Sequence, residues 1–386
     1  MKNLSLTFIL ILTLNVSFAQ SFNQFYADIV ASTLETNVLN DLTAFENLGI
    51  KTVGSSALAN TESWITTRYQ NLGYTDIVLQ PFTYSSGTSN NIIITKTGSL
   101  YPNTFVIIDA HYDTINGPGT NDNGTGTVLL LELARLLKNI DTEYSIKFIH
   151  FSGEEDGLIG SNYYVNNTVV PQNLDIKIVF NIDEVGGVNG MTNDSVVCER
   201  DLSNPSFNNA ASNAATLVLA NCIEFYSNLN SEISYAFASD YVPFENNGEI
   251  ITGLYESNVS PVNHTSNDNL ANMDVTYAYE VTKGALGAAM EFAVAFESLS
   301  INDQDYFENT VSISPNPSKN YLKIEFKNPL EYTVDFKLIN MLGENVYQNT
   351  LTKQTQTIAI DSIASAQYLA VFNINNKRFV KTIIVD

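Results

Sequence analysis

The sequence is poor in several residue types that carry chemistry: it has two cysteines, one tryptophan and three histidines in 386 residues. Two cysteines exclude a small disulfide-rich fold, which uses several bridges to compensate for a small core. Basic residues are scarce as well, with 18 Lys and Arg against 41 Asp and Glu. The net charge of −23 repels phosphate backbones and anionic lipids. It therefore argues against nucleic-acid binding and membrane-surface binding.

The negative charge is concentrated in one part of the chain. Residues 20–300 hold 9 basic and 32 acidic side chains, whereas residues 301–386 hold 8 and 9. This change in composition, in a chain that is 44% hydrophobic, predicts one large domain followed by a smaller one. The acidic field favours cationic ligands such as a peptide α-ammonium, but an acidic surface also simply keeps a protein soluble. Both interpretations stay open.

The N-terminal residues have the pattern of a signal peptide. Lys2 supplies the positive charge, residues 4–14 are mostly apolar, and Ser17-Phe18-Ala19 is a small-x-small cleavage site. The apolar run is shorter than the ~20 residues that span a bilayer, and we find no later run that would. We therefore expect a signal peptide at residues 1–19, a secreted or cell-surface protein, and no stable membrane span.

The two cysteines, Cys198 and Cys222, leave two alternatives. In an exported protein they can form one disulfide, and they can equally be two buried thiols. Neither lies in a pattern with histidine that is typical of a cysteine nucleophile.

The hydrophobic pattern of residues 20–299 predicts alternating helices and strands. Helices are expected at 22–49, 57–72, 126–138, 157–166 and 275–299, and strands at 77–79, 91–95, 104–108, 145–151 and 175–182. Near-continuous apolar strands that alternate with helices indicate an α/β fold: a mixed, mainly parallel sheet with helices on both faces. In such folds the functional site lies at the carboxyl ends of the strands.

The end of the chain has a different pattern. Residues 300–309 are polar and predict a linker. Residues 310–386 hold short alternating strands, at 321–326, 333–338 and 368–372, separated by turns. This second region is predicted to be a small all-β sandwich.

Polar side chains that can bind metal follow the predicted strands. They are His111 and Asp113, then Asp122, Glu154, Glu155, Asp183 and, in a late loop, His264. Each alone is commonplace, since a single Asp before a helix is most often a cap. Imidazole nitrogens and carboxylate oxygens together suit Zn²⁺, and a carboxylate can bridge two such ions. His150, within a strand, is interpreted as a structural histidine.

Six segments, taken in order, resemble the zinc aminopeptidases of peptidase family M28. They are residues 106–113, 118–126, 151–158, 181–186, 239–244 and 264–270. The resemblance covers the domain at 20–299 and implies the zinc exopeptidase fold. It also implies a hydrolase that holds two Zn²⁺ and releases N-terminal residues from peptides by attack of a zinc-bound hydroxide.

The resemblance also implies roles for single residues. Asp122 would bridge both metals, His111 and Asp183 would complete one site, and Glu155 and His264 the other. Glu154 would be the catalytic base. Asp113 would accept the second ring N–H of His111, and Tyr235 would assist the oxyanion. The resemblance places Asp240 behind the metal ligands, where Ser239-Asp240-Tyr241 departs from the family's Ser-Asp-His.

The tail resembles the type IX secretion sorting domain of the Bacteroidota, on residues 313–318, 336–343, 368–372 and 377–385. The resemblance implies recognition by the type IX secretion machinery, transfer across the outer membrane, and no part in catalysis. A generic adhesion-type sandwich is the alternative.

Two other functions are compatible with this fold class. Glutaminyl cyclases, which are acyltransferases, carry a Trp just before the last His, where this chain has Asn263, and its only Trp is Trp64. A non-catalytic binding domain would have lost ligands, yet every ligand position is filled here. Carboxypeptidases usually clamp a carboxylate with Arg or Lys, and only Arg200 is suitably placed in the sequence, which favours cleavage at the amino end.

Overall fold

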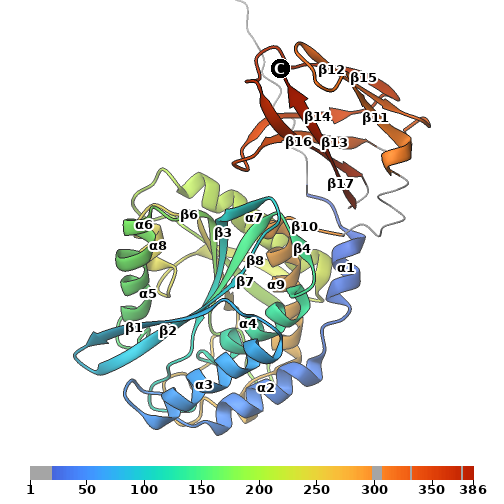
Figure 1. Ribbon diagram of the computed structural model, residues 1–386. Coiled ribbons are helices and arrows are strands. Elements are labelled where there is room, and N and C mark those ends of the chain that lie inside the picture. The colour runs from blue at the N-terminus through green and yellow to red at the C-terminus, as the bar shows by residue number, and fades with distance from the viewer. Residues whose placement is uncertain (1–19, 298–306, 331–332, 375–376) are drawn as a thin grey trace, which may run out of the picture.

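The computed structural model describes residues 20–297, 307–330, 333–374 and 377–386 (Figure 1). The predicted signal peptide at 1–19 lies outside the described residues, as does most of the predicted linker at 300–309. Among the described residues, none of the helices has the length and apolar character needed to cross a membrane.

The first region is built on one eight-stranded sheet, in the spatial order β1-β2-β5-β3-β6-β9-β7-β8. The strands are β1 Ile77–Tyr84, β2 Gly87–Lys96, β3 Tyr101–His111, β5 Tyr144–Phe151, β6 Asp175–Ile182, β7 Ser195–Arg200, β8 Asn230–Tyr235 and β9 Ile251–Glu256. β3 is parallel to both β5 and β6, β6 to β9, and β7 to β8. The other pairs are antiparallel. The predicted mixed, mainly parallel sheet is thus confirmed.

Helices cover both faces of the sheet (Figure 1). They are α1 Gln24–Val30, α2 Glu35–Asn47, α3 Ser56–Asn71, α4 Gly124–Leu137, α5 Ile159–Tyr164, α6 Val170–Gln172, α7 Asn209–Tyr226, α8 Val242–Asn246 and α9 Val275–Ala293, with a π-helical turn at Val165–Val169 and a 3₁₀ turn at Leu270–Asn272. Side chains of β3 alternate between the two faces, because successive residues of a strand point in opposite directions. Ile108 packs in the cluster with α4, α7 and α9, whereas Ile107 packs in the cluster with Tyr164 and Phe244.

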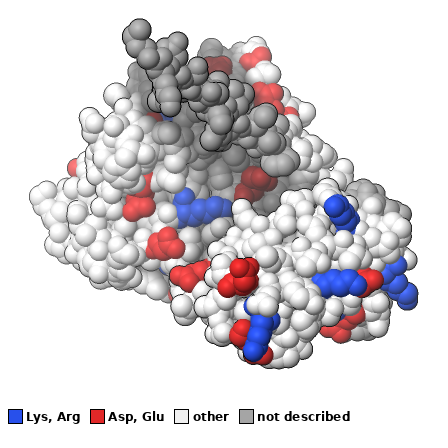
Figure 2. Space-filling model, turned by 90° about the horizontal axis from the view of Figure 1, so that it is seen from above, with Lys and Arg blue, Asp and Glu red and all other residues white. Residues whose placement is uncertain are grey.

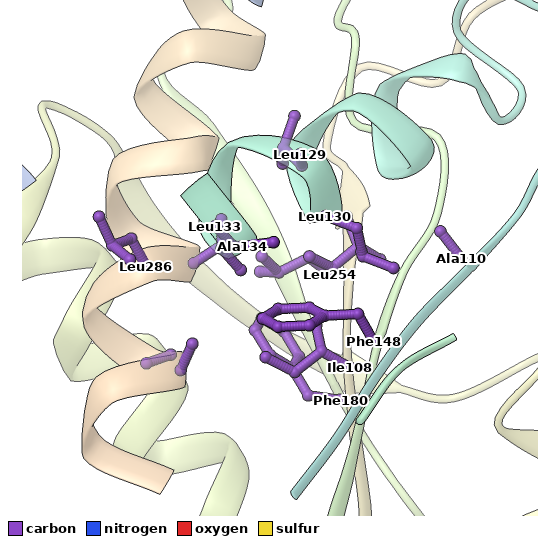
Figure 3. Packing of buried hydrophobic residues seen from close by; sticks show 14 of the residues in the cluster. Ile108, Ala110, Leu129, Leu130, Leu133, Ala134, Phe148, Phe180, Leu254 and Leu286 are labelled. Carbon is purple, nitrogen blue, oxygen red and sulfur yellow. The ribbon is translucent and has the colours of Figure 1, made fainter. Parts of the chain in front are cut away.

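The larger core lies between the middle of the sheet and helices α4 and α9. Figure 3 shows Ile108, Phe148 and Phe180, from three adjacent strands, beneath leucines of α4 and Leu286 of α9. All of these strand residues are fully buried. This packing fixes α4 above the ends of β3 and β6.

The predicted helix at 22–49 is in fact two helices, α1 and α2. The chain between them is not helical, and it is bonded to side chains of α4. The N–H of Leu34 donates to Glu132, and Nη2 of Arg135 donates to the carbonyl of Ser32. The predicted helix at 275–299 ends at Ala293, where Val294 takes a left-handed conformation with φ of 51°. Tertiary contacts and backbone conformation override the helical pattern at both places.

The second region is an all-β sandwich, as predicted. One sheet is β11-β12-β15 and the other is β14-β13-β16-β17, with every pairing antiparallel. The strands are β11 Val311–Ser314, β12 Tyr321–Phe326, β13 Val334–Asn340, β14 Asn345–Leu351, β15 Thr355–Ala359, β16 Ala366–Ile374 and β17 Lys377–Val385. Buried residues of both sheets, including Leu322, Phe336 and Phe372, form its own core.

The sandwich contacts the first region where strands of the large sheet begin. Glu143, just before β5, forms a buried ion pair with Arg378 of β17, and Nζ of Lys337 lies 3.7 Å from its other oxygen. The Arg378 guanidinium also lies 4.1 Å from the ring centre of Phe296, in the small sheet formed by β4 (Asp141–Thr142) and β10 (Ala295–Phe296).

Candidate active site

The candidate site lies at the carboxyl ends of the central strands. His111 is the last residue of β3, Asp183 directly follows β6, and Glu154 and Glu155 follow β5. Asp122 precedes α4, and His264 lies in the loop after β9. The structure brings these side chains, spread over more than 150 residues of sequence, into two adjoining groups.

The first group surrounds Nε2 of His111. This nitrogen lies 3.4 Å from Oδ1 of Asp122 and 3.4 Å from Oδ1 of Asp183, and all three residues are buried. Ligands of a tetrahedral zinc ion with bonds of ~2.0 Å lie ~3.3 Å apart. The spacing therefore suits one metal ion. Oε2 of Glu154 lies a little farther from Nε2, at 3.9 Å.

The second group surrounds Nε2 of His264, which lies 2.9 Å from Oδ2 of Asp122 and 3.0 Å from Oε2 of Glu155. Asp122 thus presents one oxygen to each histidine. Among the described residues, Oδ2 of Asp122, Oε1 of Glu155 and Oδ1 of Asp183 are buried without a hydrogen-bond donor. Buried acceptors normally have a partner, and a bound cation would supply one. The residues present therefore fit two metal ions that share Asp122.

The site is crowded with acids. Burial, opposed only in part by His111, raises the pKa of Glu154 to about 8. Burial and the Asp122 carboxylate raise the pKa of Glu155 to about 9. Burial raises the pKa of Asp122, but the nearby imidazoles of His111 and His264 outweigh it and lower that pKa to about 2. Bound cations would relieve the repulsion among these carboxylates.

Close packing between α4 and β6 brings Asp122 to Asp183. A side chain at Gly126 would place its Cβ 2.3 Å from the carbonyl oxygen of Ile182, so only glycine allows this approach. Asn123 caps α4 through the N–H of Gly126 and also donates to the Ile182 carbonyl. The helix start and the strand end are thereby fixed together.

Asp113 contacts the site differently from the prediction. The closer acceptor for Nδ1 of His111 is the backbone carbonyl of Asp113, at 3.2 Å, whereas the carboxylate lies at 3.8 Å. The Asp113 carboxylate instead accepts from the backbone N–H groups of Glu154 and Glu155, at 3.3 Å each. It therefore holds the turn that carries both glutamates.

Sequence reasoning missed two residues that support the ligands. The buried carboxylate of Asp268 accepts from the N–H groups of Asn121 and Asp122, at 2.9 and 3.0 Å. Oγ of Ser239 donates to Oδ2 of Asp183 at 2.6 Å. Both residues lie inside segments of the family resemblance, which was the available signal.

A third missed residue is Glu184, which follows Asp183. One of its oxygens lies within 4.8 Å of oxygens of Asp122 and Asp183. Its carboxylate accepts from the hydroxyl of Tyr255, at 2.8 Å, and from the side-chain amide of Asn263. Burial and the neighbouring carboxylates raise the pKa of Glu184 to about 10. Its place directly after a strand end could have identified it.

The remaining predicted residues lie in varied surroundings. Asp240 is fully buried, and burial together with the Glu154 carboxylate raises its pKa well above the usual range. Tyr241, in place of the family's His, is buried and accepts from the N–H of Phe237. Tyr235 ends β8 and is 59% exposed, and no contact in the described part of the chain joins it to the ligands.

The other histidine and the two cysteines are structural in this fold. His150 is fully buried in β5, with Nε2 2.9 Å from the hydroxyl of Tyr69, as its interpretation as a structural residue requires. Burial lowers the pKa of His150 to about 3, so the ring is neutral. Cys198 and Cys222 are buried free thiols, which is the unbridged one of the two alternatives.

Comparison with known protein families shows to which family the chain belongs. The model of peptidase family M28 matches residues 91–289, about half of the chain and all five candidate ligands. The chain belongs to peptidase family M28. The model of the secretion system C-terminal sorting domain matches residues 312–386 of this M28 protein. The predicted limits of the domains and linker remain predictions.

Individual relatives agree with this assignment. Aminopeptidase YwaD of Bacillus subtilis is 41% identical over 105 residues, which cover 27% of this chain and 23% of YwaD. Among solved structures, the zinc aminopeptidase BSAP of Bacillus subtilis aligns with a TM-score of 0.59 at 18% identity, covering 69% of this chain and 98% of BSAP. A glutaminyl cyclase of Macrostomum lignano aligns with a TM-score of 0.62 at 16% identity, covering 72% and 97%. The M28 fold alone therefore does not separate peptidase from cyclase.

Proposed function

We propose that this M28 protein is an exported aminopeptidase that holds two zinc ions and releases the first residue of peptides. The observation that carries the proposal is the position of Asp122, whose two oxygens face His111 and His264 at 3.4 and 2.9 Å. His111 and Asp183 would hold one ion and Glu155 and His264 the other. When bound, the ions supply Lewis-acid polarisation of the scissile carbonyl.

Glu154 is proposed as the general base and acid. It lies beside the first group, with Oε2 3.9 Å from Nε2 of His111, and is not one of the five proposed ligands. Its raised pKa, about 8, suits a carboxylate that takes a proton from the attacking water and gives it to the leaving amine. Asp113 would position it through the backbone N–H of residue 154.

Cleavage at the amino end is supported by the basic residues of the first region. A carboxypeptidase needs a cation that is free to bind the terminal carboxylate. Eight of the nine Lys and Arg side chains of residues 20–297 donate within the fold: Lys51 to the Gly49 and Pro118 carbonyls, Arg68 to Asp41, Lys96 to Thr142, Arg135 to Glu132, Lys138 to the Gly73 carbonyl, Lys147 to Thr95, Lys177 to the Phe292 carbonyl and Lys283 to Glu280. The ninth, Arg200, donates to Asn213 through Nη1, and its Nε is buried without a partner among the described residues.

Export is proposed from the tail. Its match to a sorting domain supports passage by type IX secretion to the cell surface or the medium. The tail would be the part that the secretion machinery recognises, and its core is separate from that of the catalytic region.

The test is a substrate panel with metal analysis. We expect the zinc-loaded protein to release leucine from leucine p-nitroanilide, to leave N-acetyl-leucine p-nitroanilide intact, and not to cyclise peptides that begin with Gln. Glu154→Gln should lose at least ~100-fold in kcat while retaining its zinc. Glu224→Gln, a change on the exposed side of α7, is the matched control. Cyclisation of N-terminal Gln, or turnover of Glu154→Gln like that of the control, would overturn the proposal.

A further inference from the structure

Two loops at the candidate site pack against each other, and neither belongs to a helix or a strand. They are the Asp122 loop, residues 112–123, and the His264 loop, residues 257–269. A Cβ on Gly117 of the first loop would lie 1.9 Å from a carbonyl oxygen of the second, so the two backbones are in contact. The distance between the two ligands therefore depends on what holds these loops together.

Glu46, near the end of α2, bonds to both segments through one oxygen. Its Oε2 accepts from Oγ1 of Thr120, at 2.9 Å, and from the backbone N–H of Leu270. Thr120 lies in the Asp122 loop, and Leu270 directly follows the His264 loop. Hydrogen bonds to a carboxylate are stronger than those between neutral groups. Because the buried face of α2 packs on α4 and α9, a carboxylate on a fixed helix joins the two loops.

Lys51 holds the Asp122 loop to the same end of α2. Its side chain is fully buried, and Nζ donates to the carbonyl of Pro118 in that loop at 2.7 Å. The same Nζ lies 3.7 Å from the ring centre of Phe45, the residue before Glu46 in α2. Burial of a charged group costs free energy unless hydrogen bonds replace its water. The buried ammonium is thus a second link between α2 and the loop.

Opposite charges meet where these links join. Burial lowers the pKa of Lys51 to about 7, and attraction to the carboxylates of Asp268 and Glu46 limits that fall. Asp268 belongs to the His264 loop, and its carboxylate accepts from the backbone N–H groups of Asn121 and Asp122. The ammonium of Lys51 is therefore close to an acid of each element that supports the metal ligands.

We propose that Glu46, assisted by Lys51, is a positioning residue that holds His264 next to Asp122 and thereby sets the affinity of the second group for its metal ion. The inference rests on the proposed two-metal function and deepens it. The first group should be less sensitive, because its other ligands lie at the ends of β3 and β6. Loss of a contact that orients metal ligands usually lowers metal affinity by about 10- to 100-fold.

The test measures the affinity for each zinc ion separately. Zinc is titrated in competition with a chromophoric chelator for the wild type, Glu46→Ala, Glu46→Gln and the control Asn40→Ala, an exposed change on the same helix. We expect Glu46→Ala to bind one ion as the wild type does and the second about 10- to 100-fold more weakly. Glu46→Gln keeps an oxygen acceptor and should recover most of this affinity. Lys51→Met, which loses the ammonium, should weaken the same ion.

Thr120→Val removes one bond to Glu46 from the side of the loop, should give a smaller loss, and serves if Glu46→Ala fails to fold. Turnover of leucine p-nitroanilide by Glu46→Ala should be low at limiting zinc and return toward the wild-type kcat at saturating zinc. Two ions bound as tightly as in the control, or both ions weakened equally, would overturn the inference even if the enzyme is an aminopeptidase. A wild type that binds only one ion would overturn the proposed two-metal function and the inference with it.

Discussion

Oδ2 of Asp122 lies 2.9 Å from Nε2 of His264, although 142 positions separate the two residues. His264 has a φ of 57°, in the left-handed region that few residues other than glycine adopt. A residue held in this conformation points to a local constraint that the surrounding structure maintains. The imidazole of His264 is also the more accessible of the two candidate histidine ligands, with 58% of the side chain exposed against 1% for His111.

Removal of His264 should therefore affect one metal ion selectively. We expect His264→Ala to bind one zinc per chain tightly and to lose the second, because His111, Asp122 and Asp183 remain in place. Asp122→Ala should weaken both sites, since its oxygens face both histidines. Zinc is counted by atomic emission after dialysis, with His150→Gln as a histidine variant outside the site. Two tightly bound ions in His264→Ala would contradict the assignment.

Asp113 gives a prediction about positioning. Its carboxylate accepts from the N–H groups of Glu154 and Glu155 and is not a proposed ligand. Asp113→Asn should lower kcat by about 10- to 100-fold, the usual effect of a residue that orients metal ligands, while both zinc ions stay bound. The measurement is turnover of leucine p-nitroanilide alongside zinc content. A normal kcat would show that the turn at Glu154 holds its shape without this contact.

His150 gives a prediction about acid stability. Burial lowers its pKa to about 3 from an ordinary value of 6.5, so between these values the unfolded chain binds a proton that the folded chain excludes. The contribution to stability is fully present above pH 6.5 and is lost as pH falls toward 3, by up to about 1.4 kcal/mol per pH unit.

Replacing His150 should therefore make the free energy of unfolding depend less on pH below 6.5. His150→Gln, which keeps a polar partner for Tyr69 but does not titrate, should lose less stability than the wild type between pH 6 and 4. Urea unfolding at several pH values measures the difference, and Tyr69→Phe tests whether the hydroxyl alone matters. Parallel pH profiles for His150→Gln and the wild type would contradict this account.

The ligands could be predicted from sequence because each lies in a simple relation to a buried strand. His111, Glu155 and Asp183 come at or just after strand ends, and parallel strands bring such ends together. The supporting contacts could not, because Asp268 bonds to backbone N–H groups nearly 150 residues away. No periodicity encodes such a contact.

Some helices and strands could not be predicted from the sequence for related reasons. Sequence reasoning assigned no elements between residues 184 and 274, which hold the short strands β7, β8 and β9 but also α7, a helix of 18 residues. The break between α1 and α2 depends on Arg135 and Glu132 of another helix, so local pattern favoured one continuous helix. Tyr235, which the family resemblance suggested as a helper for the oxyanion, ends β8, and β8 is an edge strand of the sheet.

The buried ion pair of Glu143 and Arg378 and the candidate metal ligands lie at opposite ends of β3. β3 begins at Tyr101, near this contact, and ends at His111, about 33 Å away at the usual rise of a strand. In the view of Figure 2, charged side chains are scattered among mostly uncharged surface residues. If the sandwich is held at a cell surface, the candidate metal ligands lie at the opposite end of β3 from the contact that joins the sandwich to the first region.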